Sequence, residues 1–169
     1  MRPSTIARKG FLMITYRPAV FDDIPALCVF TDFWLSGRGK SQGVPGTSND
    51  CFVSAGQHHG YIKKSTVLLA YDEKELIAWA VKHHNDTLIH MLVAAPYRGK
   101  GIGKVMVEIL KPRLVRSKTD QSTGNPTPFY EHLGYVQIAT TTSIPSFRKP
   151  RIRHKALRNI VVLQRKTNE

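Results

Sequence analysis

The segment from Tyr97 to Lys104 has the residue types of a phosphate-binding turn. It follows an apolar run at 88–94 and precedes a helical pattern. Backbone N–H groups at the start of a helix are unpaired and carry the positive end of the helix dipole, so they attract phosphate. Glycines let the backbone approach a pyrophosphate because no Cβ is in the way, and basic side chains add charge beside it. The predicted pyrophosphate site comprises Arg98, Gly99, Lys100, Gly101, Ile102, Gly103 and Lys104.

Three known phosphate-binding motifs are possible in this chain. A Walker A loop requires a glycine five residues before its Gly-Lys-Ser/Thr end. The run 39–41 supplies that end, but Trp34 stands at the first glycine position. A dinucleotide fingerprint has a different glycine spacing, and Asp120, about 20 residues on, lies in a loop-like stretch. The third motif, R/Q-x-x-G-x-G/A, fits residues 98–103 at every position.

That third motif resembles the cofactor loop of the GCN5-related N-acetyltransferases (GNAT). Two other segments are similar to this family. Residues 14–19 and 22–27 resemble its first strand and helix, and Asn125 followed by the run 129–135 resembles its N…FYEKLGF segment. The matches extend from about residue 14 to about residue 140. The resemblance implies an α/β fold with a GNAT-like mixed, mostly antiparallel central sheet flanked by helices.

The resemblance also implies a cofactor, acetyl-CoA. Its pyrophosphate would bind the 98–104 loop, and its pantetheine would lie along the strand that ends at Val93. In this family the sheet opens beside that strand, which frees backbone N–H groups for the ligand. The N–H of Leu92 or Val93 would then polarise the thioester carbonyl, and Asn125 would contact the cofactor.

Acyl transfer to an amine requires an acid for the leaving thiolate and a base for the amine. Tyr130 stands where the family often has a tyrosine that protonates the sulfur, and a phenol pKa of about 10 suits an acid. Many members use a glutamate on the preceding strand as base, but residues 87–95 contain no carboxylate. His90 on that strand and Asp120 in the polar run 116–125 remain the two candidate bases. Strand alternation places His90, Leu92 and Ala94 on one face, and Met91 and Val93 on the other.

Histidine and cysteine positions give little support to other chemistries. The pairs 58–59 and 83–84 do not have metal-ligand spacing, because neighbouring residues on a strand point to opposite faces, so we expect no metal site. Cys28 and Cys51 occur in a chain without an export signal. We expect both to be reduced thiols in a cytoplasmic protein, with no membrane-spanning segment. Neither lies in a recognisable nucleophile–base arrangement, which favours a direct ternary-complex mechanism.

Hydrophobic periodicity predicts the elements that position these residues. The helix at 101–111 has a core-facing stripe and ends before Pro112. A long loop at 36–50 is rich in Gly, Ser and Pro and would lie beside the acceptor. We expect strands at 14–18, 66–71, 76–81, 87–94, 114–117, 135–140 and 160–163, and helices at 22–35, 51–64, 101–111 and 126–133.

The length and charge of the chain limit its domain organisation and its binding partners. The 169 residues suffice for one domain, residues 14–169, preceded by a flexible basic arm at 1–13, or by an over-called start with Met13 the true beginning. The net charge is +13, and residues 87–169 carry most of it. The basic segment 148–158 predicts contact with nucleic acid, or a solvated loop that aids solubility or steers the cofactor.

The sequence therefore predicts an acetyl-CoA-dependent N-acetyltransferase whose acceptor is a primary amine on a small molecule, a protein or a nucleic-acid base. One alternative is an enzyme similar to the phage Mom-type proteins, which modify a base in DNA. Another is a non-catalytic relic that binds CoA or nucleic acid. The family is often dimeric, so the resemblance also implies a homodimer as one arrangement.

Overall fold

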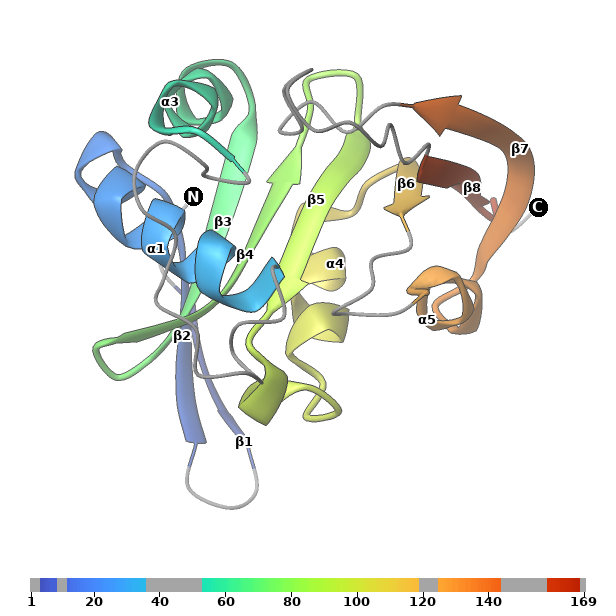
Figure 1. The fold of residues 1–169 in the computed structure, drawn as a ribbon. Helices are drawn as coiled ribbons and strands as arrows, with labels where there is room; N and C mark the ends of the chain where they lie inside the picture. Colours follow the sequence, from blue (N-terminus) through green and yellow to red (C-terminus); the bar gives the residue numbers. More distant parts are fainter. Residues whose placement is uncertain (1–3, 9–11, 36–52, 119–124, 144–157, 168–169) are drawn as a thin grey trace.

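The computed structural model describes residues 4–8, 12–35, 53–118, 125–143 and 158–167. Within these ranges, eight strands form one sheet in the order β1-β2-β3-β4-β5-β6-β8-β7 (Figure 1). Every neighbouring pair is antiparallel except β5 and β6. The predicted mixed, mostly antiparallel sheet is therefore confirmed. The strands are β1 (Ser4–Arg8), β2 (Leu12–Pro18), β3 (Thr66–Asp72), β4 (Glu75–Lys82), β5 (Thr87–Val93), β6 (Leu114–Lys118), β7 (Tyr135–Ser143) and β8 (Arg158–Arg165).

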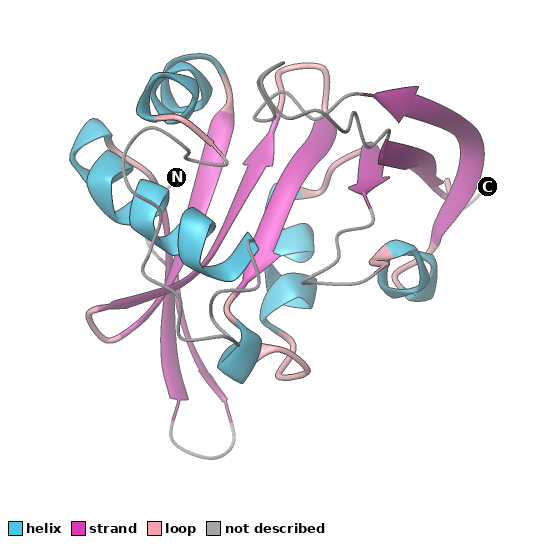
Figure 2. Cartoon of the chain, in the orientation of Figure 1, coloured by secondary structure: helices cyan, strands magenta, loops and turns pink. Residues whose placement is uncertain are grey.

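Helices cover both faces of the sheet (Figure 2). One face carries α1 and α3, and the other carries α4 and α5. Two short 3-10 turns, η1 and η2, lead into α1 and into the loop before α4. The helical elements are η1 (Phe21–Asp23), α1 (Ile24–Leu35), α3 (Ala55–Lys64), η2 (Ala95–Tyr97), α4 (Ile102–Leu110) and α5 (Thr127–His132).

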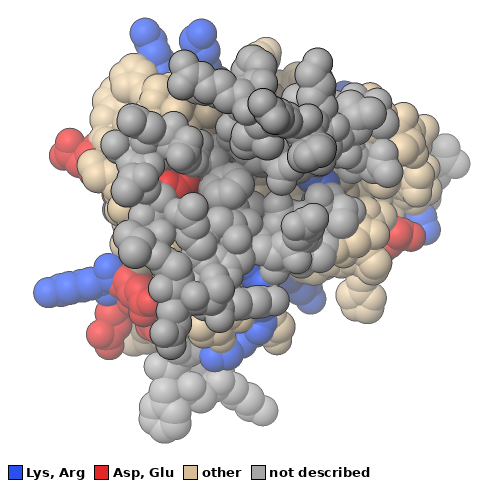
Figure 3. All heavy atoms as spheres, viewed as in Figure 1, with Lys and Arg blue, Asp and Glu red and all other residues tan. Residues whose placement is uncertain are grey.

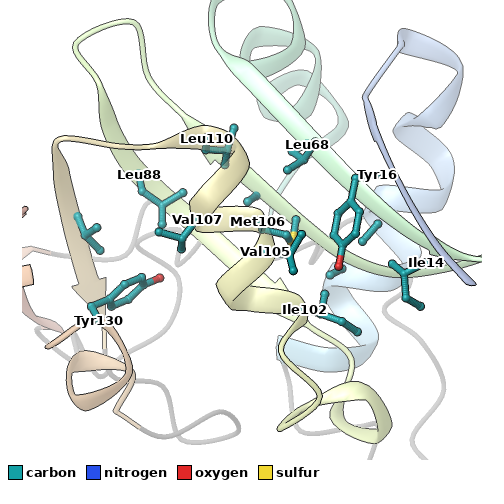
Figure 4. Close-up of a cluster of buried hydrophobic side chains, with 14 of the residues drawn as sticks. Ile14, Tyr16, Leu68, Leu88, Ile102, Val105, Met106, Val107, Leu110 and Tyr130 are labelled. Carbon is teal, nitrogen blue, oxygen red and sulfur yellow. The ribbon is translucent and has the colours of Figure 1, made fainter. Parts of the chain in front are cut away.

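Alternation along β5 divides the core into two layers. Met91 and Val93 pack into the cluster that surrounds α4, part of which is drawn in Figure 4. Leu92 and Ala94 pack on the opposite side, with α1 and the buried Trp79. This is the result of the two-residue period of a strand that is covered on both faces. The predicted separation of Leu92 from Met91 and Val93 is confirmed.

Most predicted elements agree with the structure to within a few residues, and two differences have clear causes. Helix α3 begins at Ala55 rather than near residue 51, because Ser54 and Gln57 cap it reciprocally, with Gln57 N to Ser54 Oγ at 3.1 Å. Part of the predicted N-terminal arm is an edge strand, since the backbone of β1 pairs in antiparallel register with β2. The predicted loop at 36–50 lies outside the described residues.

His58 on α3 gives a stability prediction. Its side chain is buried against Trp79, with ring centroids 5.0 Å apart, and its Nε2 has no hydrogen-bond partner among the described residues. Burial lowers the pKa of His58 from 6.5 to about 4. As the pH falls from about 6.5 to 4, the unfolded chain takes up a proton that the folded chain does not. His58 alone should therefore lower the free energy of unfolding by about 3 kcal/mol over this pH range.

Urea unfolding at pH 7 and pH 4 would measure this effect. His58→Leu removes the titrating group and keeps an apolar side chain of similar size. The difference in stability between the two pH values should be about 3 kcal/mol smaller in the variant than in the original protein. Equal pH dependence in both proteins would contradict the assignment.

Candidate active site

A cleft opens where β5 and β6 separate. These two strands pair only at Thr87–Leu114 and Leu88–Val115, at the start of each strand. Beyond these pairs β6 continues along β8, and β5 continues along β4. The resulting cleft has a volume of about 420 Å³, within the usual range for ligand pockets. Its walls are β5, β6, the loop before α4 and the start of α5.

The backbone groups of β5 that do not face β4 point toward this cleft. Ala94 N donates to Ile77 O on β4 at 2.8 Å, so the N–H of Leu92, two residues earlier, points to the same side. The carbonyls of Ile89 and Val93 point the other way, because they accept from Lys118 Nζ at 2.7 Å and Arg98 Nε at 2.9 Å. The N–H group of Val93 therefore lies on the cleft side, whereas that of Leu92 lies on the β4 side.

The glycine loop forms one end of the cleft. Gly101 is the N-cap of α4 with φ of 83°, and Gly99 has φ of 73°, in the left-handed region that favours glycine. Gly103 packs closely against α5 and β5. A Cβ there would lie 3.2 Å from Phe129 Cζ and 3.4 Å from Met91 Cε. The loop therefore brings the N-terminus of α4, which has no side-chain cap, to the end of the cleft.

Contacts outside the cleft hold this loop in place. Tyr97 Oη donates to Asp72 Oδ2 at 2.7 Å, which ties the loop to the β3–β4 turn. That hydrogen bond and burial raise the pKa of Tyr97 well above its ordinary value. Lys100 Nζ lies 5.5 Å from the centre of the Tyr97 ring. Arg98 and Lys104 line the cleft, whereas Lys100 is not among the lining residues.

Helix α5 supplies another wall of the cleft. Tyr130 lies in the cleft wall and is 5% exposed (Figure 4). Burial, with Tyr135 close by, raises the pKa of the Tyr130 phenol well above 10, so it remains protonated at neutral pH. Asn125 also lines the cleft, and its Oδ1 accepts from Thr127 N at 3.1 Å, which caps the first turn of α5.

The structure describes one of the two candidate bases, His90. His90 lines the cleft, and its Nε2 lies 3.1 Å from the Tyr61 hydroxyl on α3. Its ring also lies beside Trp79, with centroids 5.6 Å apart. The contact with Tyr61 gives His90 a defined orientation at the cleft. Asp120 lies outside the described residues.

Two cleft residues, and one residue that contacts His90 from beside the cleft, had no role in the sequence interpretation. Tyr61 belongs to a weakly periodic segment, and nothing in the spacing linked it to His90, 29 residues away. Arg116 lay in the predicted strand 114–117 without a role, and Lys118 was expected in the polar run beyond that strand. In the structure they belong to β6, which continues to Lys118 because it pairs with β8 over its full length. Alternation along β6 was the signal that could have found them.

The described part of the chain offers no sign of a metal centre or a membrane anchor. No group of three or more His, Cys, Asp or Glu side chains is placed to hold a metal ion within it. Nor does any described helix combine the length and apolar character needed to cross a bilayer. Cys28 is a free thiol, and burial raises its pKa.

Comparisons with known proteins agree with this geometry. Residues 63–137, which include β5, the glycine loop and α5, match the family model described as an acetyltransferase (GNAT) domain. No curated protein sequence matches the chain. A GCN5-related N-acetyltransferase from Rhodopseudomonas palustris superposes with a TM-score of 0.62 at 13% identity, covering 97% of this chain and 98% of that one.

Two other solved structures are similar over most of their length. The ribosomal-protein-S18-alanine N-acetyltransferase from Escherichia coli gives a TM-score of 0.58 at 13% identity, covering 93% of this chain and 97% of that one. YncA from Salmonella typhimurium, solved with acetyl-CoA, gives 0.57 at 13% identity, covering 92% and 95%.

The open β5–β6 pair beside a glycine loop at a helix start thus belongs to a GNAT fold, which defines the class of protein. Residues 63–137 of this chain carry an acetyltransferase (GNAT) domain.

Proposed function

We propose that this protein transfers an acetyl group from acetyl-CoA to a primary amine within one ternary complex. The observation that carries the proposal is the cleft between β5 and β6. It combines an N–H group on the cleft side of β5, a glycine loop at a helix start and a protonated tyrosine. The residues fit the cofactor, because Gly99 and Gly101 give the loop the positive φ values of a glycine turn at a helix start and Arg98 and Lys104 supply positive charge.

Acetyl-CoA, when bound, supplies an activated thioester carbonyl. The α4 N-terminus, with Arg98 and Lys104, would hold its pyrophosphate. The Val93 N–H, on the cleft side of β5, would donate to the thioester oxygen and stabilise the negative charge that develops there. This narrows the two donors expected from the sequence to one, because the N–H of Leu92 lies on the β4 side.

Tyr130 would donate its proton to the leaving sulfur, which its raised pKa permits at neutral pH. His90 would accept a proton from the amine, oriented by its contact with Tyr61. Asp120 remains the alternative base. A general acid or base of this kind contributes roughly 100- to 10,000-fold to the rate.

A nucleic-acid base as the amine is the second candidate function. The net charge of +13 and its concentration in residues 87–169 favour it. Binding of DNA that weakens steeply with rising salt would support this candidate, and absence of binding at about 50 mM salt would remove its main argument. A cytoplasmic location and a homodimer remain part of the proposal.

Thermal unfolding with and without excess acetyl-CoA tests the leading proposal. A ligand at 100 times its Kd stabilises the folded state by about 2.7 kcal/mol. For a domain of this size that corresponds to an increase in Tm of roughly 5–10 °C. Acetyl-CoA and CoA should both raise the Tm, and AMP, which lacks the pyrophosphate and pantetheine, should raise it less. Equal Tm values with and without acetyl-CoA would refute cofactor binding.

A further inference from the structure

We propose that the acceptor amine is a small molecule that also carries an anionic group, a carboxylate or a phosphate, and that Arg116 binds this group with Lys118 beside it. The inference rests on the proposed acetyl transfer and specifies its acceptor. It follows from the position of the two side chains, the charge of the cleft and the side of the sheet on which His90 lies.

The position of Arg116 and Lys118 follows from alternation along β6. Val115 belongs to the core around α4, and Ser117 Oγ lies 2.8 Å from Thr127 Oγ1 on α5. Val115 and Ser117 thus face the cofactor side of the sheet. Arg116 and Lys118 must point to the opposite face, on which α1 and α3 lie. Both line the cleft.

The neighbours of these side chains confirm that face. Arg116 and Lys118 both act to lower the pKa of His83 at the end of β4, after burial and His84. His83 in turn lies beside Tyr61, with ring centroids 6.2 Å apart, and Tyr61 contacts His90. The cationic wall of β6 and the candidate base therefore share one side of the sheet. An acceptor whose amine reaches His90 would therefore lie close to Arg116.

The charge of the cleft selects for an anion. Its described lining residues include Arg98, Lys104, Arg116 and Lys118, and none of them is Asp or Glu. Arg116 is exposed, and the ion pairs among the described residues are Arg17–Asp23 and Lys82–Asp86. Its guanidinium can therefore bind a carboxylate or phosphate through two parallel hydrogen bonds.

The same charges assist the chemistry of the amine. Nearby cations disfavour the protonated form of an amine and lower its pKa. An acceptor bound through its anionic group would present more of its neutral, nucleophilic amine than it does in water. A cleft without a carboxylate on β5 can therefore still deprotonate its acceptor with a weak base such as His90.

The described surface favours a small acceptor over a polymer. On the face drawn in Figure 3, described lysine and arginine side chains stand in separate groups, and acidic side chains appear at several places among them. A nucleic-acid backbone needs a continuous basic track. Arg116 and Lys118 lie inside the cleft, where they suffice for one anionic group.

Two measurements test the proposal, with Arg116→Gln as the variant and Arg113→Gln as its matched control. Arg113 is an exposed arginine three residues earlier that does not line the cleft. The first measurement titrates inorganic phosphate into CoA-saturated protein at constant ionic strength and follows the NMR signals of the Arg116 and Lys118 side chains. CoA occupies the glycine loop, so phosphate cannot report on that site.

Phosphate should cause saturable chemical-shift changes in the unsubstituted protein and in Arg113→Gln, and it should not bind to Arg116→Gln.

The second measurement compares kcat/KM for matched amines, O-phosphoethanolamine with ethanolamine and phenylalanine with phenylalanine amide. In these pairs Arg116→Gln should lower kcat/KM for the acidic member about 10- to 100-fold more than for the neutral member. Preference for the phosphate or the carboxylate pair would identify the source of the anion.

Absence of phosphate binding in CoA-saturated protein would overturn the proposal while leaving acetyl transfer intact. So would equal loss in both variants, or a preference for the neutral amines. Shifts caused by a single-stranded oligonucleotide but not by phosphate would overturn it in favour of a nucleic-acid acceptor. Failure of CoA to raise the Tm would instead refute the proposed function, and the two failures are therefore distinguishable.

Discussion

Replacing Gly101 with glutamate is expected to abolish acetyl-CoA binding while leaving the protein folded. Gly101 is the N-cap of α4, and its φ of 83° is unfavourable for any residue with a Cβ. A glutamate there would also place a negative charge beside the pyrophosphate and could cap the N–H groups that the phosphate needs. Like charges in contact cost several kcal/mol, so the Kd should rise by at least about 100-fold.

Gly134→Glu is the matched control for this experiment. Gly134 has φ of 93°, follows α5 and does not line the cleft. The substitution introduces the same backbone strain and the same charge away from the proposed site. We expect it to lower the Tm without changing the affinity for acetyl-CoA, as measured by calorimetric titration. Similar loss of affinity in both variants would show that Gly101 acts only through stability.

Replacing Tyr130 with phenylalanine is expected to lower kcat by roughly 100- to 1,000-fold with little change in acetyl-CoA affinity. The hydroxyl is the group removed, while the ring keeps its packing between α5 and the sheet. Burial keeps this phenol protonated, as a general acid requires. Because the acid acts on the leaving sulfur, ground-state binding should be nearly unchanged.

Tyr135→Phe separates this effect from the general effect of losing a buried hydroxyl. Tyr135 lies 6.3 Å from Tyr130 between ring centroids, and its hydroxyl donates to Pro112 O at 2.6 Å. Its replacement should destabilise the protein by about 1–3 kcal/mol and leave kcat within about threefold. Steady-state kinetics of CoA release would measure both variants. An unchanged kcat in Tyr130→Phe would exclude Tyr130 as the acid.

The parts of the site that are local in sequence were predictable. The pattern of residues 98–103 predicts a pyrophosphate loop, and the structure gives Gly99 and Gly101 the positive φ values that favour glycine. Turn chemistry and helix starts depend on neighbouring residues, so one short segment contains the information. The same holds for the alternation of Leu92 and Val93 along β5, which depends only on the strand period.

The parts that depend on pairing between distant segments were not predictable. Nothing in the sequence states that β5 and β6 stop pairing after Leu88 and Val115, or that Tyr61 meets His90. Strand β6 extends to Lys118 because it pairs with β8, whose residues come more than 40 positions later in the sequence. This pairing places Arg116 and Lys118 in a strand. Sheet register depends on side-chain packing summed over many strands.

The sequence by itself therefore determined the family, the glycine loop and the elements that carry the catalytic candidates. Only the tertiary structure decided which N–H of β5 faces the cleft, what orients His90 and which cations lie on the acceptor side. The physical reason is the range of the forces involved. Helix starts and turns are stabilised by contacts within a few residues, whereas a cleft exists only where two distant strands separate.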